Sequence, residues 1–188
     1  METRQGYGCE LYVGGAEVKF EISNLNACPE FKSIVANRIW LAWWKAHGHL
    51  LQVVTDFIDE LPEARGIPFC LVAHDEGKYV GSVLGLVSDL DERPELSPWI
   101  GALWVELEFR KQGVAGVLVK AALDELFVLG HEVTFLCATV EKRGMYQKQG
   151  WKLIEADVGE GKLDVFEFVK SQHHQPFIPA QAGRWIHI

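Results

Sequence analysis

The chain has 188 residues, of which 48% are hydrophobic and 23% are charged. This composition is typical of a globular protein and excludes a disordered, collagenous or low-complexity chain. The 18 Lys and Arg residues against 26 Asp and Glu residues give a formal net charge of -8. This balance argues against nucleic acid as the main partner, because phosphate binding depends on clustered basic residues. An acidic surface instead favours cationic small molecules.

The cysteine spacing and the hydropathy pattern bear on the compartment. The four cysteines are far apart and form no CxxC pair, so we expect reduced thiols in a chain that needs no disulfide to build its core. The first residues lack the apolar segment of a signal peptide, and no apolar run approaches the roughly 18 residues that span a bilayer. The sequence therefore predicts a cytoplasmic protein with no membrane partner.

The N-terminal third is predicted to form one strand and two helices. Apolar and polar residues alternate over 18–22, as in a half-buried strand. A helix capped by Asn26 or Cys28 is expected to end at Gly48. The apolar residues of 50–61 recur at i, i+3, i+4 and i+7, which predicts a second helix.

The central part is predicted to hold a hairpin, a strand and a long helix. The β-rich runs 67–73 and 79–87 are separated by an Asp-Glu-Gly turn and should pair antiparallel. An acidic loop with two prolines covers 88–98, and a strand follows over 99–105. Apolar residues at helical spacing then predict a helix over 114–129, ended by a glycine.

The C-terminal third is predicted to hold strands at 133–140, 151–156 and 163–169, with a short helix at 144–148. The mixture of hairpins with one strand–helix–strand unit predicts an α/β (α+β) fold of one domain, residues 1–170, with a mixed, mostly antiparallel sheet flanked by helices. The tail, 171–188, is either a loosely attached terminus or a strand offered to a partner.

The stretch from Trp104 to Gly116 carries the chemistry. There a strand enters a helix through a loop, with Gly113 and Gly116 near the helix start. Backbone N–H groups at a helix N-terminus lack internal partners and lie at the positive end of the peptide dipoles, so they bind phosphate readily. Arg110 and Lys111 add local positive charge. The alternative is a glycine turn with solvated basic side chains.

Two segments resemble the GNAT superfamily of N-acetyltransferases. Residues 110–115, Arg-Lys-Gln-Gly-Val-Ala, are similar to its R/Q-x-x-G-x-G/A motif, and Trp104-Val105 precedes them as in that family. Residues 146–151, Tyr-Gln-Lys-Gln-Gly-Trp, are similar to its Y-E-K-L-G-F segment. The resemblance covers roughly 67–169. Thr139 and Lys142 depart from it, because many members have Asn and Ala there.

The resemblance implies a single-domain GNAT-like fold that transfers an acetyl group from acetyl-CoA directly to a primary amine of a small molecule. It implies that Tyr146 gives a proton to the departing CoA thiolate, although packing is an alternative role for this residue. It places acetyl-CoA between the strand ending at Val105 and strand 133–140, with a backbone N–H near Leu103 to Val105 stabilising the oxyanion. The residues it assigns to acetyl-CoA are Leu103, Trp104, Val105, Arg110, Lys111, Gln112, Gly113, Val114, Ala115 and Gly116.

Several assignments stay open. A carboxylate is expected to deprotonate the acceptor amine, directly or through water, and the candidates are Asp89, Asp91, Glu95, Glu106 and Glu108. Four tryptophans line the acceptor pocket or serve packing: Trp40, Trp43, Trp44 and Trp99. No HExxH or CxxC spacing indicates a metal site. A noncatalytic acyl-CoA-binding module is the alternative function. The resemblance also allows a homodimer, because family members often pair.

Overall fold

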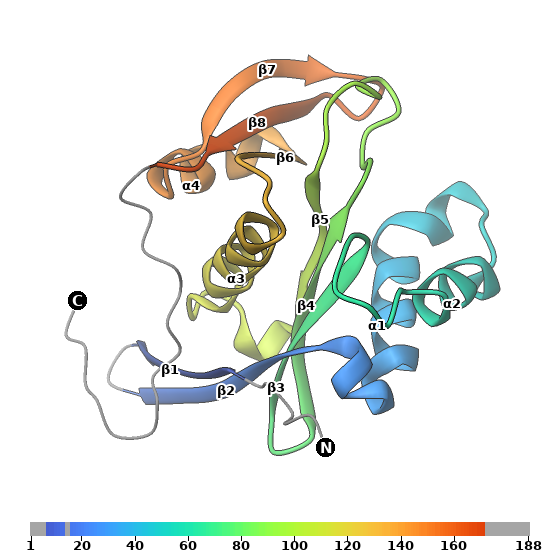
Figure 1. The fold of residues 1–188 in the computed structure, drawn as a ribbon, viewed down its shortest axis with the longest axis vertical. Coiled ribbons are helices and arrows are strands. Elements are labelled where there is room, and N and C mark those ends of the chain that lie inside the picture. The colour runs from blue at the N-terminus through green and yellow to red at the C-terminus, as the bar shows by residue number, and fades with distance from the viewer. Residues whose placement is uncertain (1–6, 14–15, 172–188) are drawn as a thin grey trace.

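The computed structural model describes residues 7–13 and 16–171. It contains one eight-stranded sheet with the order β1-β2-β3-β4-β5-β6-β8-β7 (Figure 1). The strands are β1 (Tyr7–Val13), β2 (Ala16–Asn24), β3 (Phe69–Asp75), β4 (Lys78–Leu86), β5 (Trp99–Val105), β6 (Val133–Ala138), β7 (Lys152–Val158) and β8 (Leu163–Val169). The main helices are α1 (Lys32–Ile39), α2 (Leu51–Asp59), α3 (Val114–Val128) and α4 (Arg143–Lys148).

The sheet is mixed. Only β5 and β6 pair in parallel, and every other pair of neighbouring strands in the described ranges is antiparallel. The hairpin predicted from the Asp-Glu-Gly turn is the β3–β4 hairpin. The predicted α/β (α+β) fold, with a mostly antiparallel sheet between helices, is therefore confirmed.

Two local predictions need correction. Strand β1 was not expected, because glycines in and around 7–13 weaken the strand signal. The first helix is not continuous: 3-10 turns η1 (Leu25–Ala27) and η2 (Pro29–Phe31) precede α1, and a π turn, η3 (Trp40–Trp44), and a 3-10 turn, η4 (Lys45–His47), follow it. Asn24 caps η1, and its side chain accepts from the N–H of Asn26 at 2.9 Å. Cys28, one of the two expected caps, is the N-cap of η2 and makes no side-chain capping hydrogen bond.

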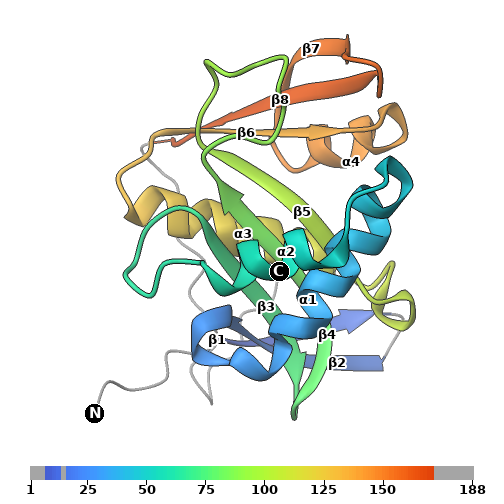
Figure 2. The same ribbon diagram turned by 90° about the vertical axis from the view of Figure 1, so that its right-hand side faces the viewer.

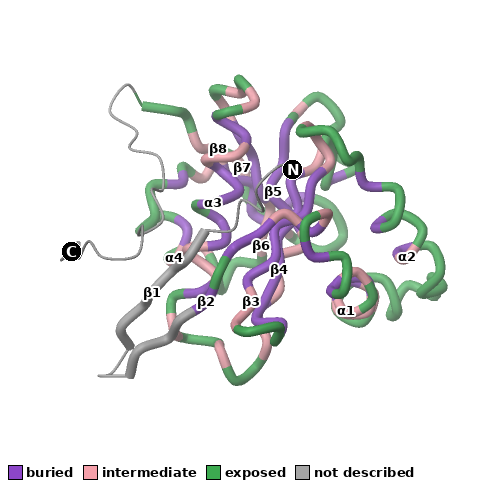
Figure 3. The backbone as a smooth tube through the Cα atoms, turned by 60° about the horizontal axis from the view of Figure 1, so that its bottom comes forward, coloured by how far each residue is buried: buried purple, intermediate pink, exposed green. Residues whose placement is uncertain are grey.

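Helices cover both faces of the sheet. Helix α3 packs on one face, while α1 and α2 pack on the other (Figures 1 and 2). The face under α3 buries Val80, Ile100 and Leu136 together with the apolar side of α3. The opposite face buries Val72 and Leu84 against the N-terminal helices. The buried stretches follow the central strands, while the outer surfaces of the helices are exposed (Figure 3).

The predictions about the C-terminal tail, the cysteines and the membrane can be compared with the described residues only in part. The tail boundary near residue 170 stays a prediction, because 172–188 lie outside the described residues. Cys28, Cys70 and Cys137, which do lie within them, are not in disulfides. No helix in the described ranges is both long and apolar enough to cross a membrane.

Candidate active site

The sheet opens between its two parallel strands. Within the described residues β5 and β6 share a single register pair, Trp99 with Phe135. The N–H of Phe135 donates to the carbonyl of Pro98 at 2.9 Å. Beyond this point β6 turns away from β5 (Figure 2). The edge of β5 toward Val105 is therefore not covered by its neighbouring strand.

A β-bulge shapes this edge of β5. On β4 the register advances from Ser82 to Leu84, while on β5 it moves from Trp104 to Gly101, so β5 contains one extra residue. Ala102, inside the bulge, has a φ of 48°. A bulge bends its strand and redirects the groups that follow it. The bulge therefore bends the end of β5 out of the regular hydrogen-bonding pattern with β4.

The backbone at the end of β5 points into the opening. The N–H of Glu106 donates to the carbonyl of Val80 on β4 at 2.9 Å. Successive N–H groups of a strand alternate between its two edges, so the N–H of Val105 points away from β4. This group is one of the backbone donors expected near Leu103 to Val105.

The N-terminus of α3 follows the end of β5 and has no side-chain cap. Gly113 is the N-cap with a φ of 81°, and Lys111 has a φ of 60°. The first bond back to the turn runs from the N–H of Val117 to the carbonyl of Gly113, at 3.2 Å. The N–H groups of the first helical turn, including those of Ala115 and Gly116, have no acceptors within the helix. This turn has the geometry of an anion site.

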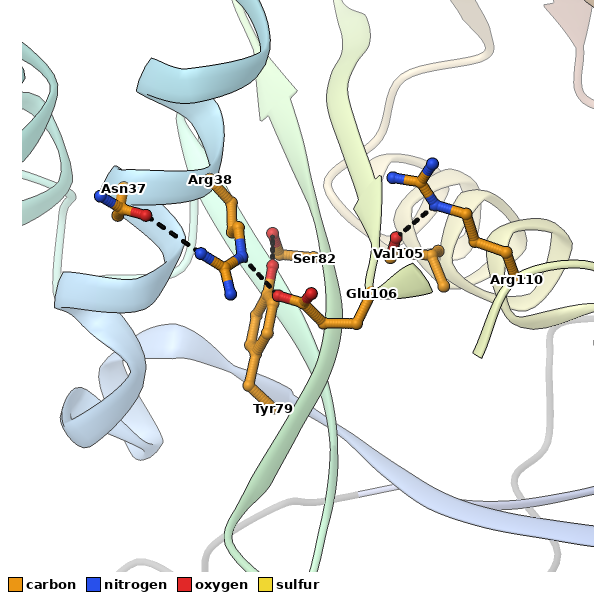
Figure 4. A network of polar contacts seen from close by, with 7 residues as sticks. All are labelled: Asn37, Arg38, Tyr79, Ser82, Val105, Glu106 and Arg110. Atoms are coloured by element: carbon orange, nitrogen blue, oxygen red, sulfur yellow. Dashed lines mark hydrogen bonds and ion pairs between the residues drawn. The ribbon is translucent and has the colours of Figure 1, made fainter. Parts of the chain in front are cut away.

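The side chain of Arg110 turns back toward β5. Its Nε donates to the carbonyl of Val105 at 2.8 Å (Figure 4). Its guanidinium lies 4.8 Å from the centre of the Trp104 ring. Gln112 turns back as well, donating from Nε2 to the carbonyl of Glu108 at 2.6 Å. Arg110 therefore fastens the turn to the end of β5, while Lys111 is exposed.

A cavity of about 610 Å³ begins at this turn and continues along α3. Its lining combines the glycines at the start of α3, residues farther along α3, and residues of the segments that follow α4. The lining residues are Gly113, Gly116, Val117, Val119, Lys120, Leu123, Gln149, Trp151, Phe168 and Ser171. A Cβ at Gly116 would lie 3.3 Å from Nε2 of Gln149. The close approach at Gly116 and the mixed lining suit a phosphate-bearing ligand with an apolar part.

Tyr146 lies on α4, on the same face of the sheet as α3. It is 7% exposed, and its ring packs 5.5 Å from that of Phe166 and 6.2 Å from that of Trp151. Burial, with a smaller contribution from Cys137, raises the pKa of Tyr146 to about 12. The phenol is therefore protonated at neutral pH and can donate a proton.

Two of the five candidate carboxylates are held in ion pairs. Glu106 accepts a hydrogen bond from Nε of Arg38, which reaches it from α1 (Figure 4). Glu108 pairs with Lys78 at 2.9 Å, and this contact lowers the pKa of Glu108. Asp91 and Glu95 make no hydrogen bond or ion pair within the described residues. Neither of the paired carboxylates is therefore set up to accept a proton.

Asp89 differs from the other four. Its carboxylate lies against Gly101 of β5 and accepts a hydrogen bond from Sγ of Cys137 on β6, at 3.6 Å. It therefore contacts both strands that form the opening. Asp89 was among the candidates from sequence, but nothing in the sequence distinguished it from the other acidic residues of its loop.

The tryptophans separate into two groups. Trp43 packs edge-on against Trp104, with ring centres 6.5 Å apart, beside the end of β5. Trp40 and Trp44 contact His49, the first through a hydrogen bond to its carbonyl and the second through its ring. Trp99 is fully buried and packs on Phe135, so its suggested place in the acceptor pocket is wrong.

The structure shows a further buried donor at the end of β5. Nε1 of Trp104 is buried, and no described residue accepts a hydrogen bond from it. A buried donor without a protein partner is commonly satisfied by water or by a ligand. Sequence reasoning missed this atom, and it also missed Gln149 and Lys120 of the cavity. Lys120 lies on α3, and only the tertiary structure brings Gln149 to this helix.

A metal centre has no support in the described ranges. No group of three or more His, Cys, Asp or Glu side chains there could hold a metal ion. The pair His173-His174 lies outside the described residues.

Comparison with known proteins gives a family and a fold. The model of the acetyltransferase (GNAT) family matches residues 35–151. No curated protein matches the chain in sequence.

Three crystal structures illustrate the similarity in fold. An aminoglycoside 6'-N-acetyltransferase complexed with coenzyme A has a TM-score of 0.61 at 16% identity, over 79% of this chain and 96% of the other. Mutant forms of a spermidine/spermine N-acetyltransferase from Vibrio cholerae have a TM-score of 0.59 at 15% identity, over 80% and 95%. An aminoglycoside 6'-acetyltransferase type Ii has a TM-score of 0.59 at 19% identity, over 79% and 96%.

Proposed function

Because the chain belongs to the acetyltransferase (GNAT) family, we propose that it transfers the acetyl group of acetyl-CoA to a primary amine of a small molecule. The observation that carries the proposal is that the opening between β5 and β6 meets the uncapped N-terminus of α3. This arrangement offers backbone donors to a diphosphate at one place and an uncovered strand edge beside it.

The residues around α3 fit acetyl-CoA. The N–H groups from Gln112 to Gly116 would hold the diphosphate, and the absence of a Cβ at Gly116 lets a ligand approach the backbone. Lys120 and Gln149 supply polar groups to the adjoining cavity. The edge of β5 from Leu103 to Val105 would hold the part that enters the sheet. When bound, acetyl-CoA supplies the activated acetyl thioester.

Tyr146 is the proposed general acid. A tyrosine hydroxyl is protonated at neutral pH, and burial raises the pKa of Tyr146 further, so it has a proton to give to a departing thiolate. Arg143, three residues earlier on α4, is bound to Asp164 of β8, and this contact fixes the helix that carries Tyr146. The alternative role of Tyr146 is packing against Trp151 and Phe166.

A small cationic amine is the proposed acceptor. The chain has a formal net charge of -8, which attracts cations through the field of the whole protein. The similar solved structures are named for aminoglycoside and for spermidine/spermine N-acetylation. The aromatic pair Trp43–Trp104 lies on the face opposite α3, where an acceptor can reach the end of β5. A cytoplasmic location and a homodimer stay predictions.

Thiol release tests this function. The purified protein is incubated with acetyl-CoA and with spermidine, kanamycin or glutamate, and free CoA thiol is measured. We expect release with the cationic acceptors. Binding of CoA by calorimetry without release from any acceptor would support the noncatalytic acyl-CoA-binding module instead. Release with glutamate alone would contradict the cationic acceptor.

The Tyr146→Phe variant separates catalysis from packing. Phenylalanine keeps the ring and its contacts but removes the acidic hydroxyl, so kcat should fall by about 10² to 10⁴. The dissociation constant of CoA, measured by calorimetry, should not change. An unchanged kcat would assign Tyr146 to packing.

A further inference from the structure

Asp89 lies where the two parallel strands part. A Cβ at Gly101 would lie 2.6 Å from Oδ2 of Asp89, so the carboxylate rests directly on β5. The same oxygen accepts the hydrogen bond from Sγ of Cys137 on β6. Gly101 and Cys137 each follow the single β5–β6 pair, Trp99 with Phe135, along their strands. The carboxylate therefore spans the start of the opening.

Asp89 and Tyr146 lie on opposite faces of the sheet. On β6, Leu136 packs into the core under α3 together with Tyr146, whereas its neighbour Cys137 packs into the cluster on the other face. Trp99 belongs to that second cluster, and side-chain alternation places Gly101 on the same face. Asp89 thus lies on the face opposite α3, the face from which an acceptor would arrive.

The surroundings of Asp89 suit a proton acceptor. As a residue it is exposed, so a ligand can reach it, while its carboxylate oxygens lie close to Gly101 and to Sγ of Cys137, where they lose part of their hydration. This desolvation raises the pKa of Asp89 to about 6, and the hydrogen bond from Cys137 opposes the rise. Cys137 itself remains a neutral thiol, because burial and the charge of Asp89 raise its pKa to about 12, with Glu92 adding to the effect.

No cation among the described residues neutralises Asp89. In the described part of the chain it forms no ion pair, in contrast to Glu106 with Arg38 and Glu108 with Lys78. A cationic amine that enters the opening would therefore be the counter-ion of this carboxylate. A base works best when its pKa lies near the working pH and it is not already paired.

We propose that Asp89 is the catalytic base that removes the proton from the acceptor ammonium. This role rests on the proposed acetyl transfer. The carboxylate of Asp89 takes one proton from the ammonium and leaves a neutral amine whose lone pair forms the new N–C bond as the thioester C–S bond breaks. Tyr146 protonates the sulfur and regains a proton from the acylated nitrogen. Asp89 then releases its proton to water, so one proton is produced in each turnover.

The pH dependence of Asp89→Asn tests this role. With spermidine as the acceptor, kcat/KM of Asp89→Asn should be about 100-fold below that of the unmodified enzyme near pH 7. The deficit should shrink toward about pH 10, where the amine loses its proton to water without help. Asp91→Asn is the matched control from the same loop and should stay within about twofold. A deficit of equal size at every pH, or no deficit, would overturn the role.

A second readout does not depend on turnover. Asparagine removes a carboxyl whose pKa is raised by folding. The ionised form of Asp89 therefore costs stability above about pH 6, and this cost is absent below the unfolded pKa. The melting temperature of Asp89→Asn should exceed that of the unmodified protein near pH 8, and the two should converge near pH 4. Equal melting temperatures near pH 8 would overturn the proposal that the carboxylate of Asp89 is desolvated in the folded protein.

The two proposals fail differently. Transfer to an amine with an unchanged Asp89→Asn variant would overturn the role of Asp89 and leave the acetyltransferase intact. If the unmodified protein transfers acetyl groups to no amine, the proposed function fails, and the catalytic role of Asp89 fails with it.

Discussion

Arg143 and Asp164 form a bidentate ion pair between α4 and β8, with Nε to Oδ2 and Nη2 to Oδ1 both at 2.7 Å. The Asp164 side chain is 1% exposed, and that of Arg143 is 35% exposed. Hydrogen bonds from Arg143 lower the pKa of Asp164. This contact joins the helix of the proposed acid to the sheet, three residues before Tyr146.

We expect Asp164→Asn to destabilise the protein by about 2 to 3 kcal/mol near pH 7, because one charge-assisted contact is lost and Arg143 is left unpaired. A lowered folded pKa stabilises the protein above the unfolded pKa of about 3.8, and this contribution is lost as the pH falls through the folded value. The difference between variant and unmodified protein, measured by urea unfolding, should therefore shrink toward about pH 2.

Glu167→Gln is the control for this change. It breaks a pair with Lys152, whose side chain is 73% exposed, and exposed pairs contribute at most about 1 kcal/mol. Equal stability losses in the two variants would show that the Arg143–Asp164 contact has no special weight.

Gly116→Ala tests the close approach at α3. Helix propensity favours alanine by about 1 kcal/mol, so the variant should not lose stability. The new methyl group stands 3.3 Å from Nε2 of Gln149 and intrudes on the surface that a diphosphate would contact. We expect the dissociation constant of CoA, measured by calorimetry, to rise about tenfold.

Further variants show where the methyl group acts. Gly144→Ala, on α4, has nothing within 4 Å of the added Cβ and should leave CoA binding unchanged. Adding Gln149→Ala to Gly116→Ala removes the side-chain clash, and Gln149→Ala alone gives the effect of losing this amide from the cavity. If the double variant bound CoA as tightly as Gln149→Ala, the methyl group would be disturbing Gln149 and not the bound phosphate.

Cys137→Ala tests the hydrogen bond that tunes Asp89. The thiol contact lowers the pKa of Asp89, so its removal should raise that pKa above about 6. The acidic limb of the kcat/KM profile with spermidine should then move to higher pH. Cys137→Ser keeps a donor at this position and should leave the limb nearer its original place. A limb that is identical in both variants would contradict the contact.

Most of the fold could be predicted because its signals are local. The apolar period of 114–129 and the turn between β3 and β4 depend on neighbouring residues alone. The breaks around α1 could not, because the π turn at Trp40–Trp44 belongs to a segment whose side chains reach both Trp104 and His49. Tertiary contacts of this kind override helical periodicity.

The candidate site divides in the same way. The helix start after Gly113 is visible in the sequence, because a glycine at a strand–helix junction has a local meaning. The choice of Asp89 among five carboxylates is not visible, because it depends on Cys137, 48 residues away, and on a bulge that involves Ala102. The inward turn of Arg110 onto Trp104 likewise needs the folded geometry.

The lone register pair of Trp99 with Phe135 also bears on mechanical strength. It divides the sheet of the described residues into two parts, β1–β5 and β6–β8. These parts are joined by one register pair and by the helices that pack against both. A molecule bound between β5 and β6 would contact both parts and would supply interactions that the two strands do not make with each other. Amide hydrogen exchange in both β5 and β6 should therefore be slower with saturating CoA than without it, because the bound ligand contacts both strands.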